Sequence, residues 1–222
     1  MILTIDFDII MAPSIELYND KVPKISWEEL LNDPYYQLLT TDNIHYFRLT
    51  QFLLSLIKQI KKEDIIIIED HKHVFDYVKE KSTIINIDHH HDLGYKDNHP
   101  KPELNCGNWA AELGKNNLLK KYIWIHNRNS LMPEENKEFL TYDICLEDVK
   151  NLSMRGKNID KLILCLSEPW VPPYVRPLFF SWIELLDFYY NTKFEIQFEE
   201  MYDINCETRR RIEDSSSEIQ NK

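Results

Sequence analysis

Glycine is scarce in this chain: only four of the 222 residues are glycine. A glycine-rich phosphate cradle is therefore excluded, and neither a G-x-G-x-x-G fingerprint nor a P-loop is present. Cysteine is equally sparse. The four cysteines lack C-x-x-C spacing, which argues against a thiolate zinc framework and favours reduced thiols over disulfides. They are Cys106, Cys145, Cys165 and Cys206.

Long apolar runs and an excess of positive charge are also missing. No apolar run approaches the roughly 20 residues that a membrane span needs, so we expect no membrane partner. The formal net charge is −11, from 26 basic and 37 acidic residues. This balance argues against a nucleic-acid partner, which requires a basic face. The chain opens on a strand-like run without a basic segment, so we expect no secretory signal and a cytoplasmic location.

The apolar content is sufficient for a packed domain, with 43% hydrophobic and 12% aromatic residues. We predict one α/β domain over residues 1–203 and a polar, flexible tail over 204–222. Residues 12–24 are expected to form a long loop. The sequence Ser26-Trp27-Glu28-Glu29 is a capping-box pattern that predicts the start of a short helix.

Apolar runs that alternate with helical patterns predict the fold class. Strands are expected at residues 1–5, 64–68, 83–87, 121–126 and 161–168, and helices at 41–62, 74–80, 109–115 and 177–190. Four consecutive isoleucines from Ile65 to Ile68 are typical of a strand buried on both faces. We therefore predict a three-layer α/β fold, with a mostly parallel sheet flanked by helices.

The run Thr83–Ile87 is followed by five ionisable residues, Asp88-His89-His90-His91-Asp92. Successive side chains of an extended chain point to opposite sides, so Asp88, His90 and Asp92 are expected to face one way. His89 and His91 are expected to face the other way. Two carboxylates and an imidazole on one side suit a cation such as Mn(II), with Zn(II) and Fe(II) left open.

Two more strands end in potential metal ligands. Asp6 and Asp8 follow the run at 1–5, and His71 follows the isoleucine strand, with His73 as the alternative to His71. Ligands of an open parallel sheet bind at the carboxyl ends of its strands, so these groups are expected to meet. Four carboxylates repel one another strongly, and two divalent cations would cancel their charge. Metal coordination would also lower the pKa of water and make it a nucleophile.

These residues resemble a known family. Asp88–Asp92 matches the D-x-H-x-D motif of the arginase (ureohydrolase) superfamily, and Thr4–Asp8 is similar to its Ser/Thr-x-D-x-D motif. Segments Asn105–Trp109 and Ser167–Pro173 resemble the branch that includes the peptide arginases. Those enzymes convert arginine in ribosomally made precursor peptides to ornithine. The resemblance extends over roughly residues 1–190, but the D-x-D motif comes early here and late in ordinary arginases.

The resemblance implies an arginase/deacetylase-like fold with permuted motif order, two Mn(II) ions and an arginine-containing precursor peptide as partner. It implies that Asp88 and Asp6 bridge the ions, that His71 and Asp92 complete one shell, and that His90 and Asp8 complete the other. Asp92 would also relay a proton, Glu168 would grip the substrate guanidinium, and His126 would be a proton shuttle. The oligomeric state stays open.

Two alternatives remain. The DHH-type phosphoesterases and pyrophosphatases also combine an early D-x-D with a later Asp, here Asp70, and an Asp-His-His. That reading needs a histidine where Thr4 stands, and it uses His89 as well as His90, whereas the arginase geometry spares His89. The other alternative is a metal-stabilised binding module that hydrolyses nothing.

Overall fold

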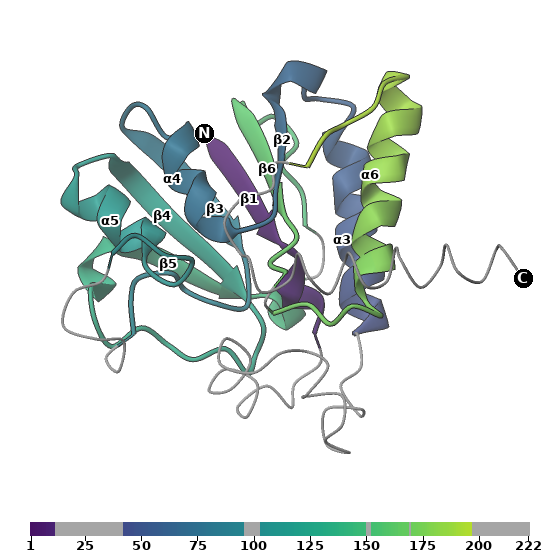
Figure 1. Ribbon diagram of the computed structural model, residues 1–222. Coiled ribbons are helices and arrows are strands. Elements are labelled where there is room, and N and C mark those ends of the chain that lie inside the picture. Colours follow the sequence, from purple (N-terminus) through teal and green to yellow (C-terminus); the bar gives the residue numbers. More distant parts are fainter. Residues whose placement is uncertain (12–41, 96–102, 150–151, 169, 197–222) are drawn as a thin grey trace, which may run out of the picture.

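The computed structural model describes residues 1–11, 42–95, 103–149, 152–168 and 170–196. The expected loop at 12–24, the helix start at 26–29 and the tail at 204–222 lie outside these ranges. Six strands form one sheet in the order β2-β6-β1-β3-β4-β5, and every neighbouring pair is parallel (Figure 1). The strands are β1 (Ile2–Asp6), β2 (Ile65–Ile68), β3 (Ser82–Ile87), β4 (Leu119–His126), β5 (Leu140–Cys145) and β6 (Lys161–Cys165).

Helices cover both faces of the sheet, which confirms the predicted α/β layering. Helices α3 (Asn43–Leu56) and α6 (Arg176–Tyr190) pack on one face, and α4 (Val74–Tyr77) and α5 (Trp109–Lys115) on the other (Figure 1). Short 3₁₀ turns are η1 (Phe7–Ile10), η4 (Lys62–Asp64), η5 (His71–His73), η6 (Lys137–Phe139) and η7 (Leu146–Asp148).

The isoleucine run of β2 shows how the sheet core is divided. Ile65 and Ile67 belong to the apolar cluster that contains residues of α3 and α6. Ile66 and Ile68 pack into the other cluster, with residues of α4 and α5. Side chains of a strand alternate between faces, so a strand covered on both sides needs an apolar residue at every position.

Two helices are shorter than the sequence predicts. Helix α3 starts after Asp42, whose side chain accepts hydrogen bonds from the backbone N–H groups of Ile44 and His45, both at 2.9 Å. It ends at Leu56, not near residue 62. The apolar spacing extends beyond the helix because Ile57 and Ile60, in the turn that follows, are also buried. Helix α4 ends at Tyr77, where Val78 turns to an extended conformation.

Strand β5 was not predicted. It lies at the edge of the sheet, and its side chains are mostly exposed, including 57% of Tyr142 and 37% of Ile144. An exposed edge strand needs no continuous apolar run, so it lacks the signal that marks the five predicted strands.

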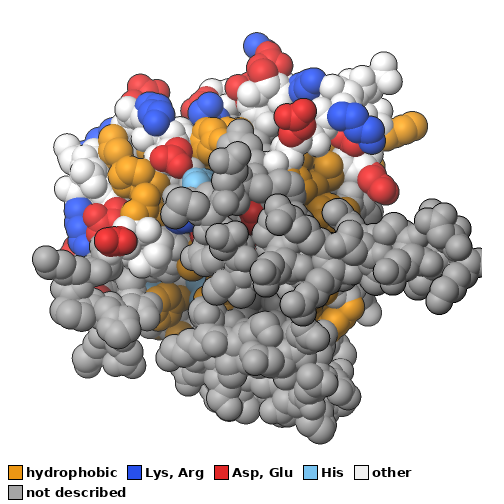
Figure 2. Space-filling model, viewed as in Figure 1, with side chains coloured by type: hydrophobic (Ala, Val, Ile, Leu, Met, Phe, Trp, Pro, Cys, Tyr) orange, Lys and Arg blue, Asp and Glu red, His pale blue; other side chains and the backbone are white. Residues whose placement is uncertain are grey.

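The described surface is mixed in charge. Acidic and basic side chains are interspersed on the face in Figure 2, so the negative net charge does not form a single patch on the part of that face that is described. Among the described residues, no helix is long and apolar enough to cross a membrane. Cys106, Cys145 and Cys165 are free thiols, as expected.

Candidate metal centre

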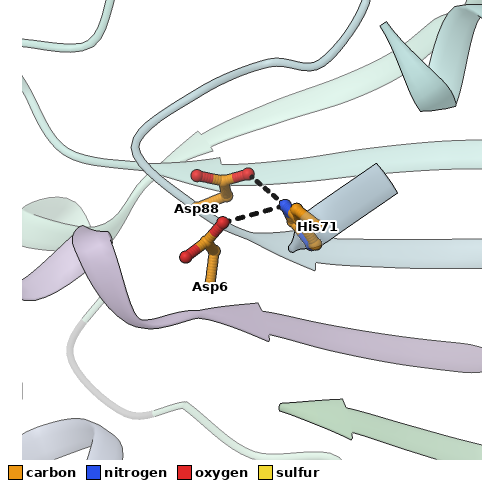
Figure 3. A group of neighbouring side chains, drawn as sticks. All are labelled: Asp6, His71 and Asp88. Carbon is orange, nitrogen blue, oxygen red and sulfur yellow. Dashed lines mark ion pairs between the residues drawn. The ribbon is translucent and has the colours of Figure 1, made fainter. Parts of the chain in front are cut away.

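Three strands end beside one another and bring their polar residues into contact. Asp6 is the last residue of β1, His71 follows β2, and Asp88 follows β3. The Nδ1 atom of His71 lies 3.0 Å from Asp6 Oδ2 and 3.0 Å from Asp88 Oδ2 (Figure 3). Asp92 Oδ2 lies 3.2 Å from the same nitrogen. One buried imidazole therefore faces three buried carboxylates.

A second group lies beside the first. His90 Nδ1 is 2.8 Å from Asp8 Oδ2 and 3.8 Å from Asp88 Oδ1. Asp88 thus presents Oδ2 to the first group and Oδ1 to the second. Each group could hold a metal ion, and Asp88 is the residue common to both. The structure therefore brings together all six residues that the sequence analysis named as metal ligands, although it places Asp6 in one group only.

The local backbone that produces this convergence differs from the expected extended chain. Strand β3 ends at Ile87, and Asp92 has a positive φ of 53°. The Asp88 side chain accepts a hydrogen bond from the backbone N–H of His90 at 2.8 Å, which tightens the turn. Strand alternation was therefore the wrong reason for grouping Asp88, His90 and Asp92.

Asp6 and Asp8 are also separated by a turn. Asp6 caps η1 and accepts a hydrogen bond from the backbone N–H of Asp8 at 3.3 Å. The 3₁₀ turn rotates Asp8 toward His90 while Asp6 faces His71. The two carboxylates consequently serve different groups.

Buried polar residues that the sequence analysis missed support the ligands. Thr4 Oγ1 lies 2.8 Å from His71 Nε2. Asn86 Nδ2 donates to Asp88 Oδ2 at 3.1 Å and to Asp92 Oδ2 at 3.3 Å. Trp109 Nε1 donates to Asp92 Oδ2 at 2.7 Å. The sequence does contain a signal for Thr4 and Asn86, since each interrupts an otherwise apolar strand. A polar residue inside a buried strand needs a hydrogen-bond partner.

The arrangement fits a cation. The Thr4 hydroxyl can accept the Nε2 proton of His71, which leaves the lone pair on Nδ1 facing carboxylate oxygens. His71 Nδ1 and Asp8 Oδ2 are buried and have no hydrogen-bond partner. Neighbouring ligands around an octahedral cation with bonds of about 2.1 Å lie about 3.0 Å apart. The 3.0–3.2 Å separations around His71 Nδ1 match that spacing.

The electrostatics point the same way. Burial, with the charge of Asp88, raises the pKa of Asp8 to about 6. Burial, with the charges of Asp92 and Asp6, raises the pKa of Asp88 to about 7. Burial alone would lower the pKa of His90, but the neighbouring carboxylates of Asp8, Asp88 and Asp92 together raise this pKa to about 9. In the absence of a metal the cluster therefore retains protons near neutral pH, and a bound cation would displace them.

The described histidines other than His71 and His90 lie outside both groups. His73 Nδ1 pairs with Asp76 at 3.1 Å, and of the two candidates His71 is the one that lies in a group that could hold a metal ion. His89 Nδ1 lies 3.2 Å from Ser130 Oγ, and burial lowers the pKa of His89 well below its usual value. His91 stacks on Tyr95 at 4.3 Å, and burial lowers the pKa of His91 to about 3.

The remaining two predicted site residues are placed differently from the ligands. His126 ends β4, is buried, and stacks on Trp124 with the ring centroids 4.3 Å apart. Glu168 follows β6, and its side chain forms an ion pair with Arg176 at the start of α6. Neither His126 nor Glu168 belongs to a metal-binding group.

Comparison of the chain with protein-family models, curated proteins and solved structures found no match. The class of the site therefore follows from its own geometry. It is a buried aspartate–histidine cluster at the carboxyl edge of a parallel sheet that could hold metal ions.

Proposed function

We propose that the protein is a dinuclear manganese hydrolase of the arginase superfamily, with an arginase/deacetylase-like fold in permuted motif order. Its reaction is the hydrolysis of the guanidinium group of an arginine residue in a peptide, which yields ornithine and urea. The observation that carries the proposal is the sharing of Asp88 by two carboxylate–imidazole groups. Four carboxylates and two imidazoles match the charge and the ligand preference of two Mn(II) ions.

The two ligand sets follow from the contacts. Asp6, His71, Asp88 and Asp92 would hold one ion, and Asp8, Asp88 and His90 the other. The ions would supply Lewis acidity and a water with a lowered pKa. The resemblance assigns proton relay to Asp92, whose Oδ2 atom accepts hydrogen bonds from Trp109 and Asn86. Burial of all these carboxylates keeps bulk water from competing for the same positions.

Three observations favour this reading over a DHH-type phosphoesterase. His89 lies outside both metal-binding groups, although the phosphoesterase arrangement would use it. Asp70, which that arrangement would also use, instead caps η5 by accepting a hydrogen bond from the backbone N–H of Lys72 at 2.9 Å. Thr4 acts as a partner of His71 and cannot replace a ligating histidine.

The choice of peptidyl arginine over free arginine rests on the resemblance of segments Asn105–Trp109 and Ser167–Pro173 to the peptide arginases. Incubation of the Mn-loaded protein with arginine-containing peptides should release urea. Mass spectrometry should show the mass decrease that accompanies conversion of arginine to ornithine. Asp88→Asn is the matched control, because it removes the shared carboxylate with almost no change in side-chain volume.

The outcome also separates the alternatives. Manganese binding without hydrolysis of any arginine peptide would favour a metal-stabilised binding module. Release of phosphate from phosphodiesters, with arginine peptides left intact, would favour the phosphoesterase and overturn the proposal.

A further inference from the structure

The acid expected to grip the substrate guanidinium already binds a guanidinium of this chain. Arg176 Nη1 pairs with Glu168 Oε1, and Arg176 Nη2 donates to the Glu168 backbone oxygen at 3.1 Å. Arg176 Nε donates to the Val171 backbone oxygen at 3.1 Å. Three donors of one guanidinium thus tie the segment after β6 to the start of α6. A substrate guanidinium therefore needs other acceptors.

Such acceptors lie at the end of β4 and within the neighbouring strand β5. His126 Nδ1 lies 2.7 Å from the backbone oxygen of Asn127. A carbonyl oxygen only accepts, so Nδ1 carries a proton, and in the neutral imidazole Nε2 then carries the lone pair. That Nε2 atom is buried, has no hydrogen-bond partner, and lies 3.8 Å from Asp143 Oδ2. A separation of 3.8 Å is too long for a hydrogen bond between the two groups.

A third acceptor comes from the next residue. Asn127 Nδ2 donates to the backbone oxygen of Ile9 at 2.9 Å, which fixes the orientation of the amide. Its Oδ1 atom is buried and has no hydrogen-bond partner. His126 Nε2 and the half-exposed Asp143 carboxylate are together called the acceptor cluster, and Asn127 Oδ1 is a further buried acceptor on the residue that follows His126.

The chemistry of the acceptor cluster selects its ligand. Buried acceptor atoms in proteins normally have a hydrogen-bond partner. Because these atoms have none within the protein, they are suited to a ligand rich in N–H donors. A guanidinium has five N–H donors in a planar fork and no acceptor. The Asp143 carboxylate adds a negative charge that favours a cation and disfavours phosphate or carboxylate ligands.

The acceptor cluster also lies next to the metal-binding groups. Strands β3 and β4 are neighbours, and the backbone N–H of Asp88 donates to Ile125, the residue before His126, at 2.9 Å. Neighbouring strands are about 4.8 Å apart. Asn127 holds the backbone of Ile9, the residue that follows Asp8. A group bound by the acceptor cluster is therefore beside both ligand sets.

We propose that the acceptor cluster is the guanidinium subsite of the metal centre, with His126 Nε2 and Asp143 Oδ2 as its principal acceptors. The identity of the substrate in this inference rests on the proposed function, but binding of a guanidinium does not require turnover. His126 therefore contacts the substrate as a hydrogen-bond acceptor, a role distinct from the proton shuttle that the resemblance implies.

The test uses the full chain loaded with Mn(II) for calorimetry, or with diamagnetic Zn(II) for NMR, and methylguanidinium as the probe. Methylguanidinium should bind and shift the ¹⁵N resonance of His126 Nε2, whereas neutral methylurea should bind more weakly. His126→Asn keeps an amide near the Nδ1 position but removes the distant acceptor, and should weaken binding about 10-fold or more. His126→Gln places an amide near the Nε2 position and should recover part of the affinity.

Asp143 provides a surface test that leaves the core intact. Asp143→Asn should weaken methylguanidinium binding about 2- to 5-fold at low salt, as expected for a half-exposed charge. Asp148→Asn removes the same charge nearby, from an exposed carboxylate that faces Arg128, and should leave binding unchanged. Metal content should stay at the wild-type level in all four variants, because none of the three positions belongs to a metal-binding group.

The results separate the two proposals. If the protein binds methylguanidinium through His126 but hydrolyses no arginine peptide, the acceptor cluster stands and the proposed function fails. If peptides are hydrolysed while His126→Asn and Asp143→Asn keep the wild-type KM and the wild-type affinity for methylguanidinium, the acceptor cluster is overturned and the proposed function stands. A drop in kcat alone in His126→Asn, with unchanged affinity, would assign His126 to proton transfer and overturn the subsite.

Discussion

Replacement of Thr4 by valine removes one hydroxyl group and keeps the shape of the side chain. Thr4 is fully buried in β1, and its Oγ1 atom lies 2.8 Å from His71 Nε2. The hydroxyl fixes the ring orientation and directs the Nδ1 lone pair toward Asp6 and Asp88. Thr4→Val should therefore weaken the ligand set that contains His71 and leave the set of Asp8 and His90 largely intact.

The magnitude follows from the type of contact. Removal of a partner that orients a metal-binding histidine typically lowers metal affinity about 10- to 100-fold, or about 1.4–2.7 kcal/mol. The metal-free protein should also lose about 1–3 kcal/mol of unfolding free energy, because a buried Nε2–H is left without an acceptor. The expected result is one tight and one weakened manganese equivalent per chain.

Calorimetric titration of the metal-free protein with Mn(II) measures both equivalents, and elemental analysis after dialysis gives the retained stoichiometry. Thr4→Ser is the matched control, since it keeps the hydroxyl and should keep most of the affinity. Wild-type affinity for both equivalents in Thr4→Val would refute the reasoning. Equal losses in the serine and valine variants would also contradict the reasoning, because serine keeps the hydroxyl that is held to orient His71.

Three further predictions concern the charges of the site. Asp88→Asn should lose both manganese ions, because the shared carboxylate is removed, whereas Asp70→Asn should retain them. Elemental analysis measures the metal content of both variants. In a phosphoesterase both variants would lose metal. In the presence of a chelator, the free energy of unfolding should fall as pH rises from about 4 to about 7. The folded-state pKa values of Asp8, about 6, and Asp88, about 7, exceed their unfolded values near 4, so the folded state binds more protons in this range. With excess Mn(II) the trend should reverse, because the ligands bind metal only when deprotonated; parallel thermal unfolding curves over pH with and without metal would contradict this. Glu168→Gln and Arg176→Gln should each lower the unfolding temperature. The double variant should be little less stable than either single variant, because each substitution removes the same ion pair. Full additivity of the two effects would show that the two residues act independently.

The convergence of the candidate ligands was predictable from sequence because they follow apolar strands in a chain whose strands are parallel. Asp6, His71 and Asp88 are polar at the point where burial ends, and a parallel sheet places all such points at one edge. The predicted strand and helix alternation was confirmed for the same reason. The separate placement of Asp6 and Asp8 was not predictable, since it depends on a 3₁₀ turn and not on strand periodicity.

Other features depend on contacts that sequence spacing does not encode. The ion-pair partner of Glu168 is Arg176, which lies at the start of helix α6. Asp92 has a positive φ, and its side chain accepts a hydrogen bond from Trp109 in α5; neither feature can be read from residue spacing. Strand β5 has a half-polar sequence because only one of its edges is paired, so it shows no buried run.

The sheet order has a consequence for how the protein is made. All six ligand positions have been synthesised by residue 92, but β2 reaches β1 only through β6, which pairs with both and is synthesised much later. His71 is attached to the end of β2, so it has no fixed place beside Asp6 until residues 161–165 insert between the two strands. A nascent chain can thus carry a full complement of ligands and still lack the pocket, and manganese uptake would report insertion of a strand that contributes no ligand.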